Sequence, residues 1–448
     1  MYDCYSKDNH ISSPFKPRLR SAAFGDLVEH FCERLGQLPD KRRGNNTIYR
    51  LEDAALSAFS IFFTQSPSFL AFQRSMQDTQ GRDNAQSLFG VYQIPCDNHI
   101  RDLLDSIPPE LLFPLFGDIL DVLHELDYLK PFSSVNNDLL IPLDGTQYHS
   151  SKSIHCDQCS QRQHRNGQIT YSHTVITPVI AAPGSNTVIP LEPEFILPQD
   201  GNEKQDCENT AAKRWLARCG SRYRALGATI LGDDLYSRQP LCEAILEQGL
   251  NFILVCKPES HQTLYEWVGE LDNTGGVQTV TRQRRRGKHT ETDSYRFVSQ
   301  VPLRNGDDAL PVNWCELTTT RADGTVVYKN AFATNHPISG DDVIDIVTAG
   351  RARWKVENEN NNTLKTKGYH FAHNFGHGQQ HLSSLLASLI ILAFLTHTVL
   401  EWMDDKYRLL RQKLSSRQRL FNNIRTLTSY LCFETWEALM DFMLNSFE

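Results

Sequence analysis

The sequence predicts an α/β fold in which helices flank a mixed β-sheet, preceded by an all-helical N-terminal segment. Two observations support this. Between residues 137 and 256, short runs rich in aliphatic and β-branched residues alternate with helical stretches, a pattern typical of strands and helices packed in layers. Before residue 137, apolar residues recur at helical spacing instead. The 448 residues are 40% hydrophobic and 22% charged, so a globular protein of two or three domains is expected.

Residues 1–135 are predicted to form a helical domain that binds DNA. Asp97 or Asn98 could cap one of its helices, and Pro108 and Pro109 end that helix and open the next. Short helices joined by polar turns suit a DNA-binding module, although a helical bundle without that function has the same pattern. The predicted helices span residues 24–35, 51–64, 98–107 and 110–129.

The rest of the chain divides into three predicted segments. Residues 136–258 form the first part of the α/β core, with strands at 137–146, 168–181, 186–197, 228–234 and 251–256 and helices at 208–226 and 240–248. Residues 259–336 are expected to be a β-rich insertion, because NG, DG and GG pairs join alternating segments. Residues 337–448 return to helices, which complete the core.

Composition also bears on where the protein works. No N-terminal stretch has the charge and apolar pattern of a signal peptide, so a cytoplasmic protein is expected. The longest apolar run, Leu385–Leu395, is short for a membrane span, and serines and histidines flank it. It is predicted to be a buried helix, and no membrane association is expected. Eleven cysteines in such a chain indicate core positions where isolated and metal binding where clustered.

Three acidic residues stand where a metal-dependent site could form. Asp144 ends the first predicted strand, Asp233 ends the fourth, and Glu357 lies on a helix after the insertion. Neighbouring strands bring such ends close together, and converging carboxylates can hold two divalent ions about 3.5–4 Å apart. An aspartate at a strand end is more often a turn former, so the surrounding residues decide.

Those surroundings are LDGTQYHSS at Asp144, LGDDLYSR at Asp233 and RARWKVENENNNTLKTKG at Glu357. In them the chain resembles the DDE insertion-sequence transposases, whose catalytic domain is ribonuclease H-like. In that family one Asp ends the first strand, a second lies in a small-Asp-x-x-aromatic context, and a Glu follows Trp-x-aliphatic. The resemblance covers residues 137–400.

Two of the three acids have an acidic neighbour that could take the same role, and the family pattern distinguishes between them. Asp234 competes with Asp233, but Tyr236 lies three residues after Asp233, as the family pattern has it. Glu359 competes with Glu357 but lacks the Trp-x-aliphatic lead.

Two basic residues match members of the family's tyrosine-arginine-glutamate-lysine signature. Arg353 and Lys365 resemble its arginine and lysine and are expected to bind DNA. Gly350 stands where the tyrosine would fall, and the lysine is one residue further along than usual.

The resemblance implies a ribonuclease H-like mixed sheet and a DNA transposase. The implied reaction is hydrolysis at the ends of a mobile element, after which the freed 3′-hydroxyl attacks target DNA. Asp144, Asp233 and Glu357 would hold two Mg²⁺ ions, with Mn²⁺ as an alternative. The implied partners are double-stranded DNA, as element ends and as target, and a second copy of the chain in the DNA complex.

A basic run within the insertion is expected to meet DNA phosphates. It reads RQRRRGK and contains Arg284, Arg285 and Arg286. The net charge of −8 does not exclude this, because a local patch can supply phosphate contacts.

A second metal site is indicated between the first two strands. Cys156-x2-Cys159 followed by His164 has the spacing of a zinc knuckle, with His155, His173 or Cys207 as candidates for the fourth ligand of one structural Zn²⁺. The alternative is a hairpin with incidental polar residues.

Two other functions remain open from the sequence. A catalytically silent DNA-binding regulator derived from a transposase is disfavoured because all three acids are present. A nuclease without strand transfer shares the first chemical step, so the sequence does not separate it from a transposase.

Overall fold

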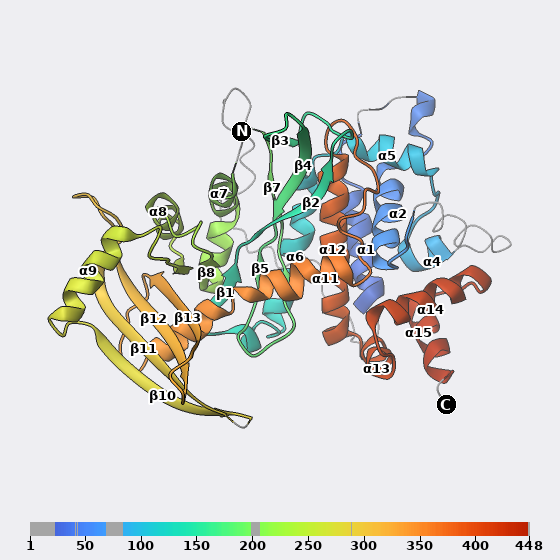
Figure 1. Cartoon of the computed structure of the whole chain (residues 1–448). Helices are drawn as coiled ribbons and strands as arrows, with labels where there is room; N and C mark the ends of the chain where they lie inside the picture. The colour runs from blue at the N-terminus through green and yellow to red at the C-terminus, as the bar shows by residue number, and fades with distance from the viewer. Residues whose placement is uncertain are drawn as a thin grey trace. The chain divides into compact units, whose positions relative to one another are not determined.

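The computed structural model describes residues 23–40, 42, 44–68, 84–198, 207–287 and 289–446. These residues form two compact units (Figure 1). The helical unit draws on residues 1–128, 367–370 and 374–448, and the α/β unit on residues 129–366 and 371–373.

The main sheet of the α/β unit has seven strands in the order β1-β8-β9-β13-β12-β11-β10. β1, β8 and β9 are parallel, and the other neighbours are antiparallel, so the sheet is mixed, as expected. The strands are β1 (Leu139–Pro142), β8 (Ala228–Gly232), β9 (Asn251–Val255), β10 (Gln278–Arg286), β11 (His289–Pro302), β12 (Pro311–Arg321) and β13 (Val326–Thr334).

Shorter strands form two further sheets in this unit. In one of them β2, β4 and β3 are neighbours and β7 also pairs with β4; in the other β5 pairs with β6. They are β2 (Gly145–Ser151), β3 (Ser160–Gln163), β4 (Ile169–Ile176), β5 (Val179–Ile180), β6 (Ile189–Pro190) and β7 (Glu194–Ile196).

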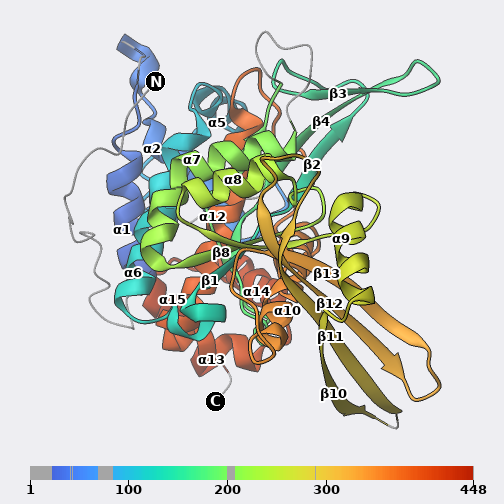
Figure 2. The same ribbon diagram turned by 90° about the vertical axis from the view of Figure 1, so that its left-hand side faces the viewer.

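Two helices pack on opposite faces of the main sheet. Tyr265 of α9 makes an edge contact with Trp314 of β12, whereas α10 packs on the apolar cluster that contains Cys315 and Leu317. Since successive side chains of a strand point to opposite faces, α9 and α10 cover different sides. Figure 2 shows both helices beside β11–β13. The helices of this unit are η3 (Lys130–Phe132), η4 (Val135–Asn137), α7 (Glu208–Leu226), α8 (Gln239–Glu247), α9 (Gln262–Asn273), α10 (Val343–Arg351), the π-helix η5 (Val356–Asn361) and α11 (Asn362–Thr366).

Gly350 lets α10 lie close to the sheet. A Cβ atom at this position would come within 2.8 Å of the Phe332 ring and 2.9 Å of Ile253 Cγ2. Both neighbours are buried, so a larger side chain would push α10 away from the sheet. The packing therefore gives a reason why Gly350, and not a tyrosine, stands at this position.

The helical unit is built around α12, which packs against helices from the N-terminal half of the unit, α1, α2, α5 and α6. Asp105 accepts hydrogen bonds from the backbone N–H groups of residues 379–382 and so stabilises the start of α12. The helices are α1 (Ala23–Leu35), η1 (Gly44–Thr47), α2 (Leu51–Phe63), α4 (Asn84–Phe89), α5 (Asp97–Asp105), η2 (Pro109–Leu112), α6 (Phe113–Glu125), α12 (Leu382–Met403), α13 (Asp405–Lys413), α14 (Arg417–Tyr430) and α15 (Trp436–Asn445).

Helix α12 is the one helix in the described part of the chain that is long and apolar enough to cross a membrane. Its most apolar window is 89% buried within the protein, as in the core helix of a soluble protein. The buried helix predicted at Leu385–Leu395 is therefore confirmed.

The α/β fold class is confirmed, and two details differ from the expectation. Residues 262–273 form helix α9 at the start of the segment predicted to be β-rich. The residue that caps α5 is Cys96, so Asp97 is the first helical residue. The predicted division of the chain at 136, 259 and 337 stays a prediction, while the C-terminal helices group with the N-terminal ones in a single unit.

Candidate functional site

Asp144 and Asp233 follow two neighbouring parallel strands. In the β1–β8 pair, Pro142 lies opposite Leu231, and the Leu143 N–H donates to the Leu231 carbonyl at 2.8 Å. Continuing this register by two residues places Asp144 opposite Asp233. Because parallel strands end at the same edge of a sheet, both carboxylates lie at its carboxyl edge, where ligands of α/β sheets usually bind.

Glu357 lies on the π-helix η5 and is exposed. Its charge reaches Asp144, whose pKa is raised to about 6. Burial is the largest cause; the Arg353 guanidinium opposes it, and nearby carboxylates add to it. In order of effect, these carboxylates are Glu208, Glu357 and Asp233. The charges of the other two sequence-predicted acids, Asp233 and Glu357, thus both act on Asp144.

Glu208 is a fourth carboxylate at this place, and the sequence analysis did not find it. It is the first residue of α7, and its carboxylate accepts the Tyr236 hydroxyl at 3.1 Å and the Gly145 N–H. Burial raises the pKa of Glu208, and the charge of Asp233 raises it further. A Cβ atom on Gly145 would lie within 2.5 Å of this carboxyl group, so glycine after Asp144 is what lets Glu208 approach.

Two cationic side chains accompany the carboxylates. The Lys365 ammonium donates to the Thr146 hydroxyl at 2.6 Å. Burial lowers the pKa of Lys365, and the charge of Asp144 opposes that shift. Arg353 lowers the pKa of Asp144, and its Nε atom is buried without a hydrogen-bond partner among the described residues. Both sequence-predicted cations therefore lie near Asp144.

The competing acids are engaged elsewhere. Asp234 accepts the Lys257 N–H at 2.7 Å and the Ser260 hydroxyl at 2.6 Å, so it ties the turn after β8 to the loop after β9. Glu359 pairs with Lys355 one helical turn away, at 3.7 Å. Asp233 also accepts a hydrogen bond in this turn, from the Leu235 N–H at 2.8 Å, so the choice of Asp233 rests on its place at the end of β8 beside β1.

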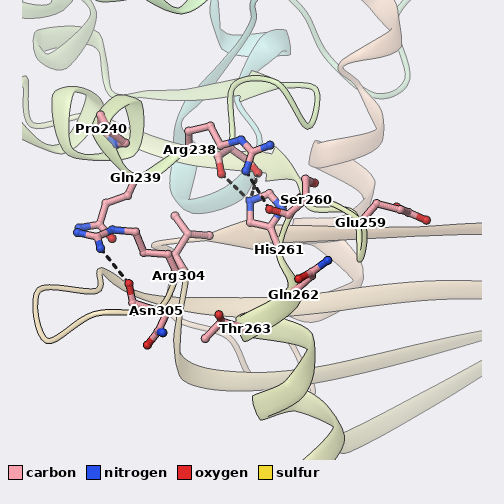
Figure 3. Close-up of a pocket in the computed structure, with 12 residues that line it drawn as sticks. Arg238, Gln239, Pro240, Glu259, Ser260, His261, Gln262, Thr263, Arg304 and Asn305 are labelled. Carbon is pink, nitrogen blue, oxygen red and sulfur yellow. Dashed lines mark hydrogen bonds between the residues drawn. The ribbon is translucent and has the colours of Figure 1, made fainter.

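A pocket of about 500 Å³ lies beside this turn, lined by Ser237, Arg238 and His261 among others (Figure 3). The His261 Nε2 atom is 2.7 Å from the Ser237 hydroxyl, and Asp234 lies near the other ring nitrogen, which resembles a nucleophile–base–acid series. However, Nε2 is also 2.6 Å from the Ser237 carbonyl oxygen, which only accepts hydrogen bonds. Nε2 therefore carries a proton and cannot act as the base for a serine that is itself fully buried. The group is structural.

Cys156, Cys159 and His173 form a buried group that could hold a metal ion. The two sulfur atoms are 4.0 Å apart, and the His173 Nε2 atom lies 3.6 Å from Cys156 Sγ and 3.4 Å from Cys159 Sγ. A hydrogen bond from the Cys156 thiol lowers the pKa of Cys159 to about 7.

His164 and His155 lie outside this group, which corrects the proposed ligand set. His164 is exposed in the turn between β3 and β4, where its Nε2 atom meets the Thr170 hydroxyl at 2.8 Å. His155 is exposed and packs on the Tyr171 ring. His173 takes the place given to His164 because Ser160 pairs with Ser172, so the preceding Cys159 faces His173 across the hairpin.

Cys207, the other candidate ligand, is exposed and contacts the Thr210 hydroxyl at the start of α7. The Asn166–Gly167 pair is the feature of the sequence that could have identified His173 as a ligand. A turn there fixes the register of the hairpin and hence the residue opposite Cys159.

The basic run lies on the β10–β11 hairpin of the main sheet. Arg285 is exposed, whereas Arg284 pairs with the buried carboxylates of Glu291 and Asp293 at 3.2 and 3.0 Å. The side chain of Arg286 lies outside the described part of the structure. Arg285 is therefore more available to a phosphate than Arg284.

The raised pKa of Asp144 predicts how pH affects the metal-free protein. Between the ordinary carboxyl pKa and about 6, the folded state binds more protons at Asp144 than the unfolded state, so stability falls as pH rises through this window. The Asp144→Asn variant has no titrating carboxyl at this position, so it lacks this loss of stability with rising pH. We expect its melting temperature, measured in a chelator, to exceed that of the parent by more at pH 7.5 than at pH 5. An equal difference at both pH values would contradict the burial of a titrating carboxyl at Asp144.

Comparison with known proteins adds no identification. No protein-family model matches the chain. A search of curated proteins also finds no match.

Proposed function

We propose that this protein is a DNA transposase that cleaves the ends of a mobile element and joins them to target DNA. The observation that supports the proposal is the β1–β8 register, whose continuation by two residues would bring Asp144 opposite Asp233, together with the charge of Glu357 acting on Asp144. The sequence contexts of the three acids supply the kind of chemistry.

A ribonuclease H-like core is part of the proposal. Asp144 and Asp233 follow the parallel strands β1 and β8, and β2, which begins directly after Asp144, is the first strand of the separate antiparallel sheet with β4 and β3. Helix η5 adds the third acid from outside the sheet. This arrangement supports the proposed core.

The donor set fits Mg²⁺, or Mn²⁺ in its place. Carboxylate oxygens are the ligands that these hard cations prefer. Asp144, Asp233 and Glu357 would hold the ions, and Glu208 lies close enough to share in the site. Four acids against the charges of Arg353 and Lys365 leave an excess of negative charge, which divalent cations would neutralise.

Bound ions would supply activation of the attacking water or hydroxyl and stabilisation of the leaving oxygen. The chain's own cations have a different task. Arg353, with its partner-free Nε, and Lys365 are placed to contact the phosphate beside the carboxylates. Arg285 on the hairpin would contact the DNA backbone further away, as Arg286 would by sequence, while Arg284 is largely neutralised. We propose double-stranded DNA as the partner, a homodimer in the DNA complex, and a cytoplasmic location.

We also propose that Cys156, Cys159 and His173 hold a structural Zn²⁺. In a tetrahedral zinc site with Zn–S of about 2.3 Å and Zn–N of about 2.0 Å, two sulfurs lie about 3.8 Å apart and a sulfur and a nitrogen about 3.5 Å apart. The observed 4.0, 3.6 and 3.4 Å agree with this geometry. The ion would clamp the segment before β3 onto β4, which runs back to the Asp144 turn.

A cleavage and joining assay tests the function. Purified protein is incubated with Mg²⁺, labelled DNA that carries the element's ends, and a supercoiled target. We expect 3′-hydroxyl ends and joined products, both lost in EDTA. Cleavage without joining would replace the proposal with a nuclease, and binding without cleavage would replace it with a silent regulator.

A further inference from the structure

Asn361, the last residue of the π-helix η5, contacts Asp144 directly. Its Nδ2 atom donates to Asp144 Oδ2 at 3.1 Å. Its Oδ1 atom accepts the Thr177 hydroxyl at 2.6 Å and Asn360 Nδ2 at 3.1 Å. The exposed fractions of Asn361, Thr177 and Asn360 are 5%, 1% and 0%, so water does not compete for these bonds.

The contacts close a ring. The Thr177 N–H donates to the backbone carbonyl of Asp144 at 3.2 Å, and the Thr177 hydroxyl donates to Asn361, which donates back to the Asp144 carboxylate. The orientation of the Asn361 amide is fixed, because its oxygen already meets two donors and its nitrogen must face the carboxylate. One oxygen of Asp144, Oδ2, is thereby held by Asn361.

The same helix carries Glu357. Residues four apart in a π-helix lie almost one turn apart, so Glu357 and Asn361 project from similar sides of η5. Fixing Asn361 on Asp144 therefore also fixes the distance between the two acids. π-Helical turns often occur at functional sites, where the extra residue redirects a side chain.

We propose that Asn361 is a positioning residue for metal binding, which orients Asp144 and sets its spacing from Glu357, with Thr177 as its anchor. The inference rests on the proposed function of the carboxylate site. Asn361 acts through Asp144 and does not itself touch metal or DNA.

Two variants break the ring at different bonds. Asn361→Ala removes the donor to Asp144, and Thr177→Val removes only the anchoring hydroxyl while keeping the shape of the side chain. Thr177→Ser restores the hydroxyl. Asn358→Ala is the matched control, because Asn358 is an exposed asparagine on the same π-helix.

The Mn²⁺ dissociation constant, measured by titration calorimetry, is the first readout, with kcat and KM for cleavage of element-end DNA and the melting temperature beside it. Loss of a group that orients a metal ligand costs about 10- to 100-fold in affinity or activity. We expect that loss in Mn²⁺ affinity and in kcat for Asn361→Ala and Thr177→Val, with KM for DNA little changed. Thr177→Ser and Asn358→Ala should behave like the parent.

The double variant decides whether the two residues act as one unit. If they do, combining Asn361→Ala with Thr177→Val weakens Mn²⁺ binding no more than Asn361→Ala alone. Parent-like Mn²⁺ affinity in Asn361→Ala, even with a lowered melting temperature, would overturn the inference, since Asn361 would then serve the fold alone. If Asp144→Asn kept full cleavage, the proposed function would fail instead, and Mn²⁺ affinity would still report on Asn361 separately.

Discussion

Replacing Asp144 with asparagine is expected to lower Mg²⁺-dependent cleavage of element-end DNA by about a thousandfold or more. Metal ligation stabilises such a transition state by several kcal/mol. Each loss of about 1.4 kcal/mol of this stabilisation slows the reaction about tenfold. The asparagine amide keeps the size of the side chain and an oxygen that can accept the bond from Asn361 Nδ2. The fold should therefore persist, and the loss should lie in kcat. Single-turnover cleavage at saturating DNA is the measurement.

Glu357 offers a matched pair for this experiment. Glu357→Gln should cause a loss of similar size, whereas Glu359→Gln, on the same π-helix, should leave cleavage close to that of the parent because Glu359 pairs with Lys355. Full cleavage by Asp144→Asn and Glu357→Gln would mean that the carboxylates are not the catalytic group. Equal losses for Glu357→Gln and Glu359→Gln would mean that the helix, and not one acid, is required.

Removing both thiolates, by Cys156→Ser with Cys159→Ser, is expected to abolish zinc binding and destabilise the α/β unit. Structural zinc sites contribute folding free energy directly, so a loss of about 3 kcal/mol or more is reasonable. For a unit of this size each kcal/mol shifts the melting temperature by about 2–4 °C, so a fall of about 10 °C is expected. Zinc content by plasma emission spectrometry and thermal unfolding measure the two effects.

Cys207→Ser is the control for that experiment, because Cys207 is exposed and contacts Thr210. It should retain the zinc and the melting temperature of the parent. His173→Ala should lose zinc, whereas His164→Ala should keep it, because His164 lies in the hairpin turn. Zinc content that is unchanged in the double cysteine variant would remove the zinc proposal.

Much of the α/β unit was predictable because its signals are local. Helix α7 spans Glu208–Leu226, as predicted, and β8 and β9 coincide with the buried aliphatic runs. The position of Asp144 and Asp233 after neighbouring strands was also predictable, since neighbouring parallel strands end at one edge of the sheet. Helix α9 was missed although Leu264, Val268 and Leu271 recur at helical spacing, because the segment was grouped with the strand-like stretches that follow it.

The other residues proposed for the site could not be predicted from the sequence, because their roles depend on contacts between residues far apart in the chain. A glutamate in the first turn of a helix, such as Glu208, is ordinary, and only the approach to Gly145 marks it as part of the site. Asn361 is one of a run of asparagines, and the π-helical turn decides which of them faces Asp144. The need for glycine at position 350 likewise depends on distant residues, because a Cβ atom there would collide with Phe332 and Ile253.

The location of divalent metal in the folded protein tests the central claim most directly. Crystals soaked in Mn²⁺ and measured near the manganese absorption edge would show each ion as an anomalous peak. We expect two peaks about 3.5–4 Å apart among Asp144, Asp233 and Glu357, both absent in Asp144→Asn. Mn²⁺ bound elsewhere, with no peak at these carboxylates, would contradict that claim.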